Sequence, residues 1–394
     1  MFLLFTLSSC KEEKNDEVLQ LVEKSLETAY AHSLAMADAL GDMPGQLPKT
    51  IGVDGELETC ESWWWVSGFF PGQLWYMYEY SGDELMKTWA EIYTERVRDQ
   101  QFTTNNHDVG FMIYCSFGNG YRLTGKADYL EVIRNSSYSL ITRFNDLIGC
   151  IQSWDRAEWN QQWQYAVIID NMMNLEMLEF SSRKFGEPLF SYVARAHANT
   201  TIKHHFRPDG SSYHVVSYDT ITGQPELYHT DQGFSHNSAW ARGQAWALYG
   251  YTMMYRESGQ EEYLAQANIV ADFILNHPRL PEDKIPYWDF DSPEIPDDFR
   301  DASSGAIICS ALLELFQYVD EERAAEYLKV AEKQLVALSN EPYLASPGEN
   351  QNFILKHSVG HWPNKSEIDV PLSYADYYFV EALLRYRKLF GEKE

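Results

Sequence analysis

A recurring glycine corner is the feature that most restricts the fold of this 394-residue chain. Each copy places a glycine between the end of one helical segment and the polar start of the next, where a helix C′ position needs positive φ. The copies are Tyr80-Ser81-Gly82-Asp83, Leu123-Thr124-Gly125-Lys126, Lys184-Phe185-Gly186-Glu187, Glu257-Ser258-Gly259-Gln260 and Leu389-Phe390-Gly391-Glu392, with a degenerate sixth, Tyr318-Val319-Asp320-Glu321, that lacks glycine. Six such corners predict six helical hairpins.

The segments on either side of the corners differ in character. Those before the corners begin at a capping-type residue and continue with apolar residues at helical spacing, which indicates inner helices. They begin near Asp108, Asp170, Ser238, Ser303 and Ser373. Those after the corners, such as 261–276 and 321–339, are more charged and are typical of outer amphipathic helices. The pattern predicts an all-α fold, an (α/α)6 barrel built as a toroid of six hairpins. An open solenoid has the same periodicity, so periodicity alone leaves closure undecided.

A small β-hairpin is expected at the mouth of the barrel. Its strands are 212–218 and 226–230, around Thr222-Gly223. No Pro/Gly/Ser-rich linker divides the chain, so residues 26–394 are predicted to form a single (α/α)6 catalytic domain. Residues 11–25 are predicted to be a tether or the start of the first helix.

The N-terminal residues 1–10 resemble the remnant of a bacterial lipoprotein signal. A short apolar run ends in Leu7-Ser8-Ser9-Cys10 and is followed by a polar segment. Small residues before a cysteine that becomes lipidated are typical of such signals, so Cys10 is the expected lipidation site, and we expect a periplasmic or outer-membrane-anchored protein. A frayed N-terminal extension is the alternative. The remaining cysteines have no CxxC spacing, which favours buried free thiols over disulfides or a zinc site: Cys60, Cys115, Cys150 and Cys309.

Composition narrows the class of ligand. A formal charge of −27 argues against binding to nucleic acid or to an anionic membrane surface. Aromatic residues make up 15% of the chain, with 12 Trp and 26 Tyr. This surplus suits a sugar-binding cleft, where ring faces stack on aromatic planes, although large cores also use Trp and Tyr. An acidic substrate would have to meet a local patch of positive charge.

Two carboxylates are the best candidates for chemistry. Asp108 and Asp170 start inner helices, so they converge at one end of the predicted barrel. Asp170 follows the apolar run 166–169, and burial beside a second carboxylate raises the pKa of a carboxyl, as a general acid requires. The alternative is that both are ordinary N-caps. The sequence has no HExxH, nucleophile-elbow, P-loop or dinucleotide motif, so no metal and no cofactor are predicted.

Several blocks, in order along 60–385, carry a family resemblance. They are Asn106-His107-Asp108-Val109-Gly110-Phe111, Ile169-Asp170-Asn171-Met172-Met173-Asn174, Trp240-Ala241-Arg242-Gly243-Gln244-Ala245-Trp246, Pro286-Tyr287-Trp288-Asp289-Phe290-Asp291 and Arg300-Asp301-Ala302-Ser303-Ser304. Together they closely resemble the unsaturated glucuronyl hydrolases, glycoside hydrolase family 88. The resemblance implies that Asp170 is the general acid/base and Asp108 its partner.

The resemblance also implies a subsite for an unsaturated uronate, lined by His214, Gln232, Arg242 and Trp246. Arg242 is expected to pair with the substrate carboxylate, but an internal ion pair is the alternative. Trp246 lies four residues later on the same helical face, so it shares the cleft or belongs to the core; His214 has a similar structural alternative.

Other polar and aromatic residues are candidates for holding the sugars. Trp63 and Trp154 are candidate stacking platforms, although Trp63, Trp64 and Trp65 cannot all face one way. The basic and polar segment 356–366 is a candidate contact for the leaving sugar or its sulfate.

The implied reaction acts on an acidic oligosaccharide made by a polysaccharide lyase, which leaves a C4=C5 enol ether in its terminal uronate. Protonation at C4 and addition of water at C5 then release the next sugar, with neither carboxylate attacking the anomeric carbon. The alternatives are an unsaturated rhamnogalacturonyl hydrolase acting on pectin fragments, an (α/α)6 lyase or epimerase, and a non-catalytic glycan-binding lipoprotein. The sequence predicts no oligomeric state and no particular polysaccharide.

Overall fold

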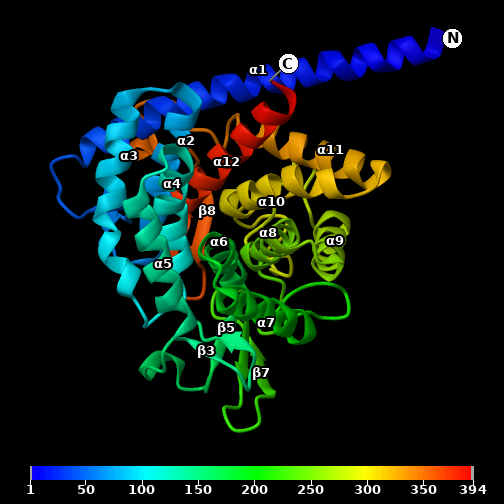
Figure 1. Cartoon of the computed structure of the whole chain (residues 1–394). Helices are drawn as coiled ribbons and strands as arrows, with labels where there is room; N and C mark the ends of the chain where they lie inside the picture. Colours follow the sequence, from blue (N-terminus) through cyan, green and yellow to red (C-terminus); the bar gives the residue numbers. More distant parts are fainter. Residues whose placement is uncertain (1, 392–394) are drawn as a thin grey trace.

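The computed structural model describes residues 2–391, with side chains from residue 16 onward, and this part of the chain is mostly helical (Figure 1). Six helical segments form an inner ring and six pack outside it. The inner segments are α2 (Phe69–Ser81), a π-helix (Gly110–Gly118) continued by α4 (Asn119–Thr124), a 3-10 turn (Ile169–Asn174) continued by α6 (Leu175–Phe185), α8 (Ala241–Ser258), α10 (Ala302–Leu315) and α12 (Ser373–Phe390). The outer helices are α1 (Phe2–Ala39), α3 (Glu84–Arg96), α5 (Ala127–Ile141), α7 (Pro188–His204), α9 (Glu261–Asn276) and α11 (Glu321–Leu338).

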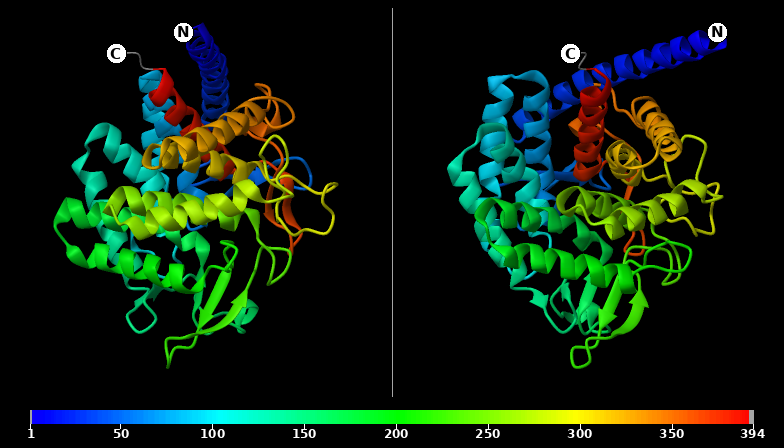
Figure 2. Two further views of the ribbon diagram at one scale, coloured as in Figure 1. Left: turned by 90° about the vertical axis from the view of Figure 1, so that its right-hand side faces the viewer. Right: turned by 45° about the vertical axis from the view of Figure 1, so that its right-hand side comes forward.

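The inner ring is closed. Each inner segment packs against the next, and α12 packs against both α10 and α2, so the last inner helix meets the first. Each outer helix packs on one inner segment, with α1 serving α12. The fold is therefore an (α/α)6 barrel, as predicted, and the open solenoid is excluded (Figure 2).

Four of the predicted glycine corners have the expected geometry. Gly82, Gly125, Gly186 and Gly259 have φ between 67° and 69° and join an inner helix to its outer partner. At the degenerate corner, Asp320 caps α11 by accepting hydrogen bonds from the backbone N–H groups of its first turn. The prediction is wrong at Gly391, which has φ −95°. The outer helix that packs on α12 is α1, from the other end of the chain.

Helix α1, from the N-terminal part of the chain, supplies the outer helix that packs on α12. Val18, Val22 and Leu26 are buried, so the packed domain begins before residue 26, within the segment expected to be a tether or the start of the first helix. The side chain of Cys10 lies outside the described residues. Among the helices that the structure describes, none combines the length and apolar character needed to cross a membrane. Cys60, Cys115, Cys150 and Cys309 are free thiols, and all but Cys115 are buried, largely as predicted.

Short sheets decorate the end of the barrel away from the C-terminus (Figures 1 and 2). The predicted hairpin is present as β6 (Val215–Tyr218) and β7 (Pro225–His229). A third strand that the sequence did not reveal, β5 (Ala166–Ile168), pairs with β6. Three two-stranded sheets complete the strands: β1 (Leu47–Ile51) with β2 (Leu57–Cys60), β3 (Phe144–Asn145) with β4 (Cys150–Ile151), and β8 (Ser358–His361) with β9 (Ser366–Val370).

A close backbone contact fixes the start of the π-helix. A Cβ atom on Gly68, just before α2, would lie 2.2 Å from the carbonyl oxygen of Phe111 and 2.3 Å from that of Met112. Side chains cannot yield here because the atoms in the way are backbone, so only glycine fits. This contact sets the position of the first π-helical turn and of Asp108 immediately before it.

Candidate active site

The three-stranded sheet places Asp170 beside His214. Ile168, near the end of β5, pairs antiparallel with Val215 at the start of β6. Asp170 follows Ile168 by two residues and His214 precedes Val215, so both side chains project from the same end of the sheet. The Nε2 atom of His214 lies 3.7 Å from Oδ2 of Asp170. The apolar run before Asp170 is thus the strand that delivers it.

Neither candidate carboxylate is an ordinary helix cap. The N-cap of the π-helix is Val109, one residue after Asp108, and the N-cap of the 3-10 turn is Ile168, two residues before Asp170. Neither cap position makes a side-chain capping hydrogen bond. True carboxylate caps do occur in this fold, at Asp301 and Asp320. The stabilising role that the sequence left open therefore does not explain Asp108 and Asp170.

Burial makes Asp170 a group that can hold a proton near neutral pH. Desolvation raises its pKa to about 7, against the attraction of the Arg242 guanidinium. The nearby Asp108 carboxylate raises the pKa further, and the Trp246 indole N–H lowers it. The charge of Asp108 therefore favours the protonated form of Asp170.

Asp108 is paired with a neutral histidine. Desolvation raises the pKa of Asp108 to about 7, and the buried charge of Arg143 lowers it. His107 Nδ1 lies 2.9 Å from the carbonyl oxygen of Ser153 and donates to it, so Nε2 is an acceptor; this nitrogen lies 3.3 Å from Oδ1 of Asp108. Desolvation lowers the pKa of His107 to about 3, so the ring stays neutral. An acceptor at this distance favours the protonated form of Asp108.

His214 is also a neutral imidazole, but it turns its N–H, rather than its unprotonated nitrogen, toward the neighbouring carboxyl. Its Nδ1 accepts the backbone N–H groups of Asp231 at 3.1 Å and Gln232 at 3.3 Å, so the proton is on Nε2. Desolvation lowers its pKa to about 3. Asp170 therefore faces an N–H donor that stabilises its ionised form. Gln232 helps to orient the His214 ring through its backbone N–H. Its half-buried side chain stays a predicted contact for substrate.

Arg242 is fully buried and tied to β8. Its guanidinium donates to the carbonyl oxygens of Val359 and Gly360, the latter at 2.6 Å, and lies 3.7 Å from Asp301. The rings of Trp240 and Tyr374 flank it. The internal ion pair that the sequence left as an alternative is therefore present. Nε of Arg242 has no hydrogen-bond partner among the described residues, so the group still contributes positive charge to the pocket.

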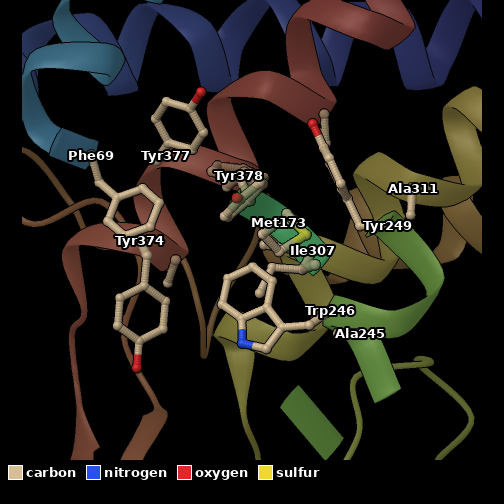
Figure 3. Packing of buried hydrophobic residues seen from close by; sticks show 14 of the residues in the cluster. Phe69, Met173, Ala245, Trp246, Tyr249, Ile307, Ala311, Tyr374, Tyr377 and Tyr378 are labelled. Carbon is tan, nitrogen blue, oxygen red and sulfur yellow. The ribbon is translucent and has the colours of Figure 1, made fainter. Parts of the chain in front are cut away.

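An aromatic plug, made of Trp246 and the rings of Phe111 and Tyr378 that it contacts, separates the two ends of the barrel. Trp246 contacts Phe111 and Tyr378, and Figure 3 shows the indole nitrogen of Trp246 and the hydroxyl of Tyr374 on one side of the plug, opposite the hydroxyls of Tyr377 and Tyr249. Behind the plug lies a cavity of about 580 Å³. Its charged side chains pair with one another, as Arg122 does with Glu79 and Arg256 with Glu176.

The polar atoms on the carboxylate side of the plug are unpaired. Five of them are buried without a hydrogen-bond partner among the described residues: Asp170 Oδ2, His107 Nε2, His214 Nε2, Trp246 Nε1 and Tyr374 Oη. Buried polar atoms are nearly always satisfied, so such a concentration marks a place where a ligand supplies the partners. This end of the barrel is therefore the candidate active site. No group of three or more potential metal ligands occurs in the described part of the chain.

The predicted aromatic platforms are placed differently. Trp154 lies edge-on to His214, with ring centroids 6.1 Å apart, and belongs to the mouth. Trp63 is 57% exposed and contacts Trp64 and Glu61. Of the three consecutive tryptophans, Trp65 is the one that packs on Tyr374, at 4.9 Å. The stacking role of Trp63 stays a prediction.

Comparison with known proteins agrees with this geometry. The family model of Glycosyl Hydrolase Family 88 matches residues 42–387. The chain belongs to family 88. It is 48% identical over 327 residues to the unsaturated glucuronyl hydrolase of Formosa agariphila, covering 82% of this chain and 80% of that protein. A crystal structure of an unsaturated glucuronyl hydrolase specific for heparin superposes with a TM-score of 0.91 at 46% identity, covering 95% of this chain and 98% of the other.

A second solved structure contains a ligand. It is a mutant unsaturated glucuronyl hydrolase from Streptococcus agalactiae in complex with dGlcA-GalNAc6S. Its TM-score to this chain is 0.77 at 26% identity, with coverage of 93% of this chain and 91% of the other. The protein is thus a glycoside hydrolase of family 88, and the site described above is where its chemistry is to be sought.

Three residues at the site were not predicted from the sequence. His107 was part of the family resemblance only, yet it is the neighbour of Asp108. Tyr374 directly follows Ser373, a predicted helix start, and the convergence of such starts at one barrel end was a usable signal for it. Arg143 reaches the site from α5 and the loop after it, through hydrogen bonds to Thr104 and Asp155, and no local pattern announces it.

Proposed function

We propose that this family 88 enzyme removes the terminal 4,5-unsaturated uronic acid from lyase-generated oligosaccharides of the glycosaminoglycan or ulvan type. The observation that carries the proposal is the buried Asp170 carboxyl, whose pKa is raised to about 7 and whose Oδ2 lacks a partner among the described residues. A carboxyl in that state can donate and recover a proton near neutral pH.

The chemistry needs one proton donor that becomes a base. Protonated Asp170 delivers its proton to C4 of the enol ether, which leaves positive charge at C5 shared with the ring oxygen. The Asp170 carboxylate is then stabilised by the N–H groups of His214 and Trp246 and by the charge of Arg242. Water adds at C5 as Asp170 takes one of its protons. The resulting hemiketal opens to a C5 ketone, and the hemiacetal at C1 releases the next sugar.

Asp108 has a different task in this scheme. Burial raises its pKa to about 7, so the carboxyl can hold a proton beside Asp170 near neutral pH. A neutral carboxyl can donate a hydrogen bond to a substrate hydroxyl. As it ionises, its charge raises the pKa of Asp170 and helps keep the donor protonated.

The direct test follows the ultraviolet absorbance of the conjugated enol ether and carboxylate. Purified protein is added to unsaturated disaccharides made by lyases from several uronate polymers. Loss of absorbance with release of the second sugar supports the proposal and identifies the polymer. Turnover of pectin-derived fragments alone favours an unsaturated rhamnogalacturonyl hydrolase. Binding without absorbance loss on every substrate favours a non-catalytic glycan-binding protein.

The pH profile should depend on the pair of carboxyls. Because Asp170 must be protonated to act on C4, we expect kcat/KM to fall as pH rises through about 7, its raised pKa. In Asp108→Asn the carboxylate that raises this pKa is gone, so the falling limb should move to lower pH. Residual activity measured from acid to alkaline pH checks this. An unchanged limb in Asp108→Asn would show that the two carboxyls do not interact.

The segment 356–366 offers one unpaired cation for the leaving sugar. Lys356 pairs with Glu341, and His361 pairs with Asp231, next to Gln232. Lys365 is exposed and has no ion-pair partner among the described residues. The position supports the expectation that this segment meets the sugar after the uronate or its sulfate.

We further propose a lipid anchor at Cys10, with the enzyme in the periplasm or at the outer membrane. The support is the sequence Leu7-Ser8-Ser9-Cys10 before a polar segment. Expression in a Gram-negative host should give a protein that labels with palmitate and partitions into the membrane fraction, and globomycin should block its processing. Cys10→Ser should abolish labelling. Unlabelled wild-type protein would count against the anchor.

A further inference from the structure

Two histidines at the barrel mouth form a stacked pair. His229 ends β7 and His236 lies in the following loop; their ring centroids are 3.8 Å apart and their planes differ by 9°. The pair borders the pocket of Asp170. Val215, the residue after His214, pairs with His229 in the sheet, and Thr230 Oγ1 lies 3.4 Å from Nδ1 of His214.

Both rings have the same nitrogen occupied. The indole N–H of Trp163 donates to Nδ1 of His229, and the backbone N–H of Thr230 donates to Nδ1 of His236, each at 3.1 Å. A neutral imidazole that accepts at Nδ1 carries its proton on Nε2. Among the described residues, neither Nε2 has a hydrogen-bond partner. The pair therefore presents two free N–H donors.

The stack brings these donors close together. Every atom of an imidazole ring lies little more than one ångström from the ring centroid, so the two Nε2 atoms are neighbours whatever the rotation of each ring in its plane. Two adjacent N–H donors suit neighbouring oxygens of one oxyanion. They do not suit a metal ion, because protonated nitrogens have no lone pair to give and stacked rings do not point at one centre.

The surroundings indicate a sugar. Trp154, Trp159 and Trp163 contact one another beside the pair, and Trp159 is 55% exposed. Trp154 also contacts His214, so this aromatic wall runs from the uronate pocket to the histidine pair. A sugar attached to the uronate would extend along it, with ring faces on aromatic planes.

We infer that His229 and His236 form an outer subsite, where their Nε2–H groups bind an oxyanion substituent, such as a sulfate ester, on the sugar released by the reaction. This inference rests on the proposed function.

The test compares selectivity between two unsaturated disaccharides that differ only in sulfation of the leaving sugar. His229→Phe and His236→Phe keep an aromatic ring in the stack and remove its N–H donor. We expect each to lower the ratio of kcat/KM, sulfated over unsulfated, by about tenfold. The matched control is His204→Phe, whose ring packs on Tyr218, at the other end of β6 from His214. An unchanged ratio in both pair variants, or an equal drop in the control, overturns the subsite.

A binding measurement separates this inference from the proposed reaction. Calorimetric titrations compare Asp170→Asn with the Asp170→Asn/His236→Phe double variant on the same two disaccharides. Weaker binding of the sulfated sugar alone supports the subsite, even where the wild-type protein hydrolyses neither sugar, a result that counts only against the proposed function. Equal affinities of the two proteins for both sugars overturn the subsite.

Discussion

Asp170→Asn should lower kcat for unsaturated disaccharides by about 10³- to 10⁴-fold, because one side chain supplies both the proton for C4 and the base for water. The amide is similar in size to the carboxyl, and it can still meet the N–H groups of His214 and Trp246 through its oxygen. Substrate binding should therefore persist. Absorbance loss measures turnover, and calorimetry measures the affinity that remains.

Two controls make the Asp170→Asn result decisive. Asp42→Asn makes the same chemical change at an exposed position far from the pocket and should hydrolyse like the wild type. Asp170→Asn should unfold at a temperature at least as high as that of the wild type near neutral pH. Burial opposes ionisation of the Asp170 carboxyl, and the amide does not ionise. Wild-type turnover in a folded Asp170→Asn protein would remove this residue from the mechanism.

The helical hairpins could be predicted from the sequence because the signals that end their helices are local. A glycine in the left-handed region ends a helix by a rule that involves only its neighbours, and Gly82, Gly125, Gly186 and Gly259 obey it. Closure of the ring could not be predicted from such local signals. It depends on α12 packing against α2, which lie far apart in the sequence, and no local pattern encodes that contact.

Short strands show the same limit. The run Ala166-Val167-Ile168 is too short to be told from the start of a buried helix by periodicity, and it is a strand only because β6 lies beside it. The consequence for the site is direct, since that pairing, rather than a helix cap, brings Asp170 next to His214.

The chemistry of the site was predictable in kind and incomplete in detail. Two carboxylates at the starts of inner segments were expected to converge, and the π-helix after Asp108 packs against the 3-10 turn that contains Asp170. The state of each histidine was not predictable, because it depends on which nitrogen meets a distant backbone group. His107 donates to Ser153, 46 residues away, and His214 accepts from Asp231, 17 residues away.

The structural prediction with the largest effect concerns Asp301, a fully buried carboxylate at the start of α10. It accepts hydrogen bonds from the backbone N–H groups of Ser303, at 3.1 Å, and Val359, at 3.3 Å, and it balances the charge of Arg242. Arg242 in turn holds the carbonyl oxygens of β8. Asp301 thus joins α8, α10 and β8 through one buried ion pair.

Asp301→Ala should lower the free energy of unfolding by about 3–5 kcal/mol, because it leaves the buried guanidinium of Arg242 without its carboxylate. Urea denaturation measures the loss. The double variant Asp301→Ala/Arg242→Met removes both charges, so it should recover part of that stability while still losing activity. This contrast isolates the ion pair from the other hydrogen bonds of Asp301, since those are lost in both proteins. If the double variant is instead less stable than Asp301→Ala alone, the charge of Arg242 is balanced elsewhere, and its anchoring of β8 outweighs its pairing with Asp301.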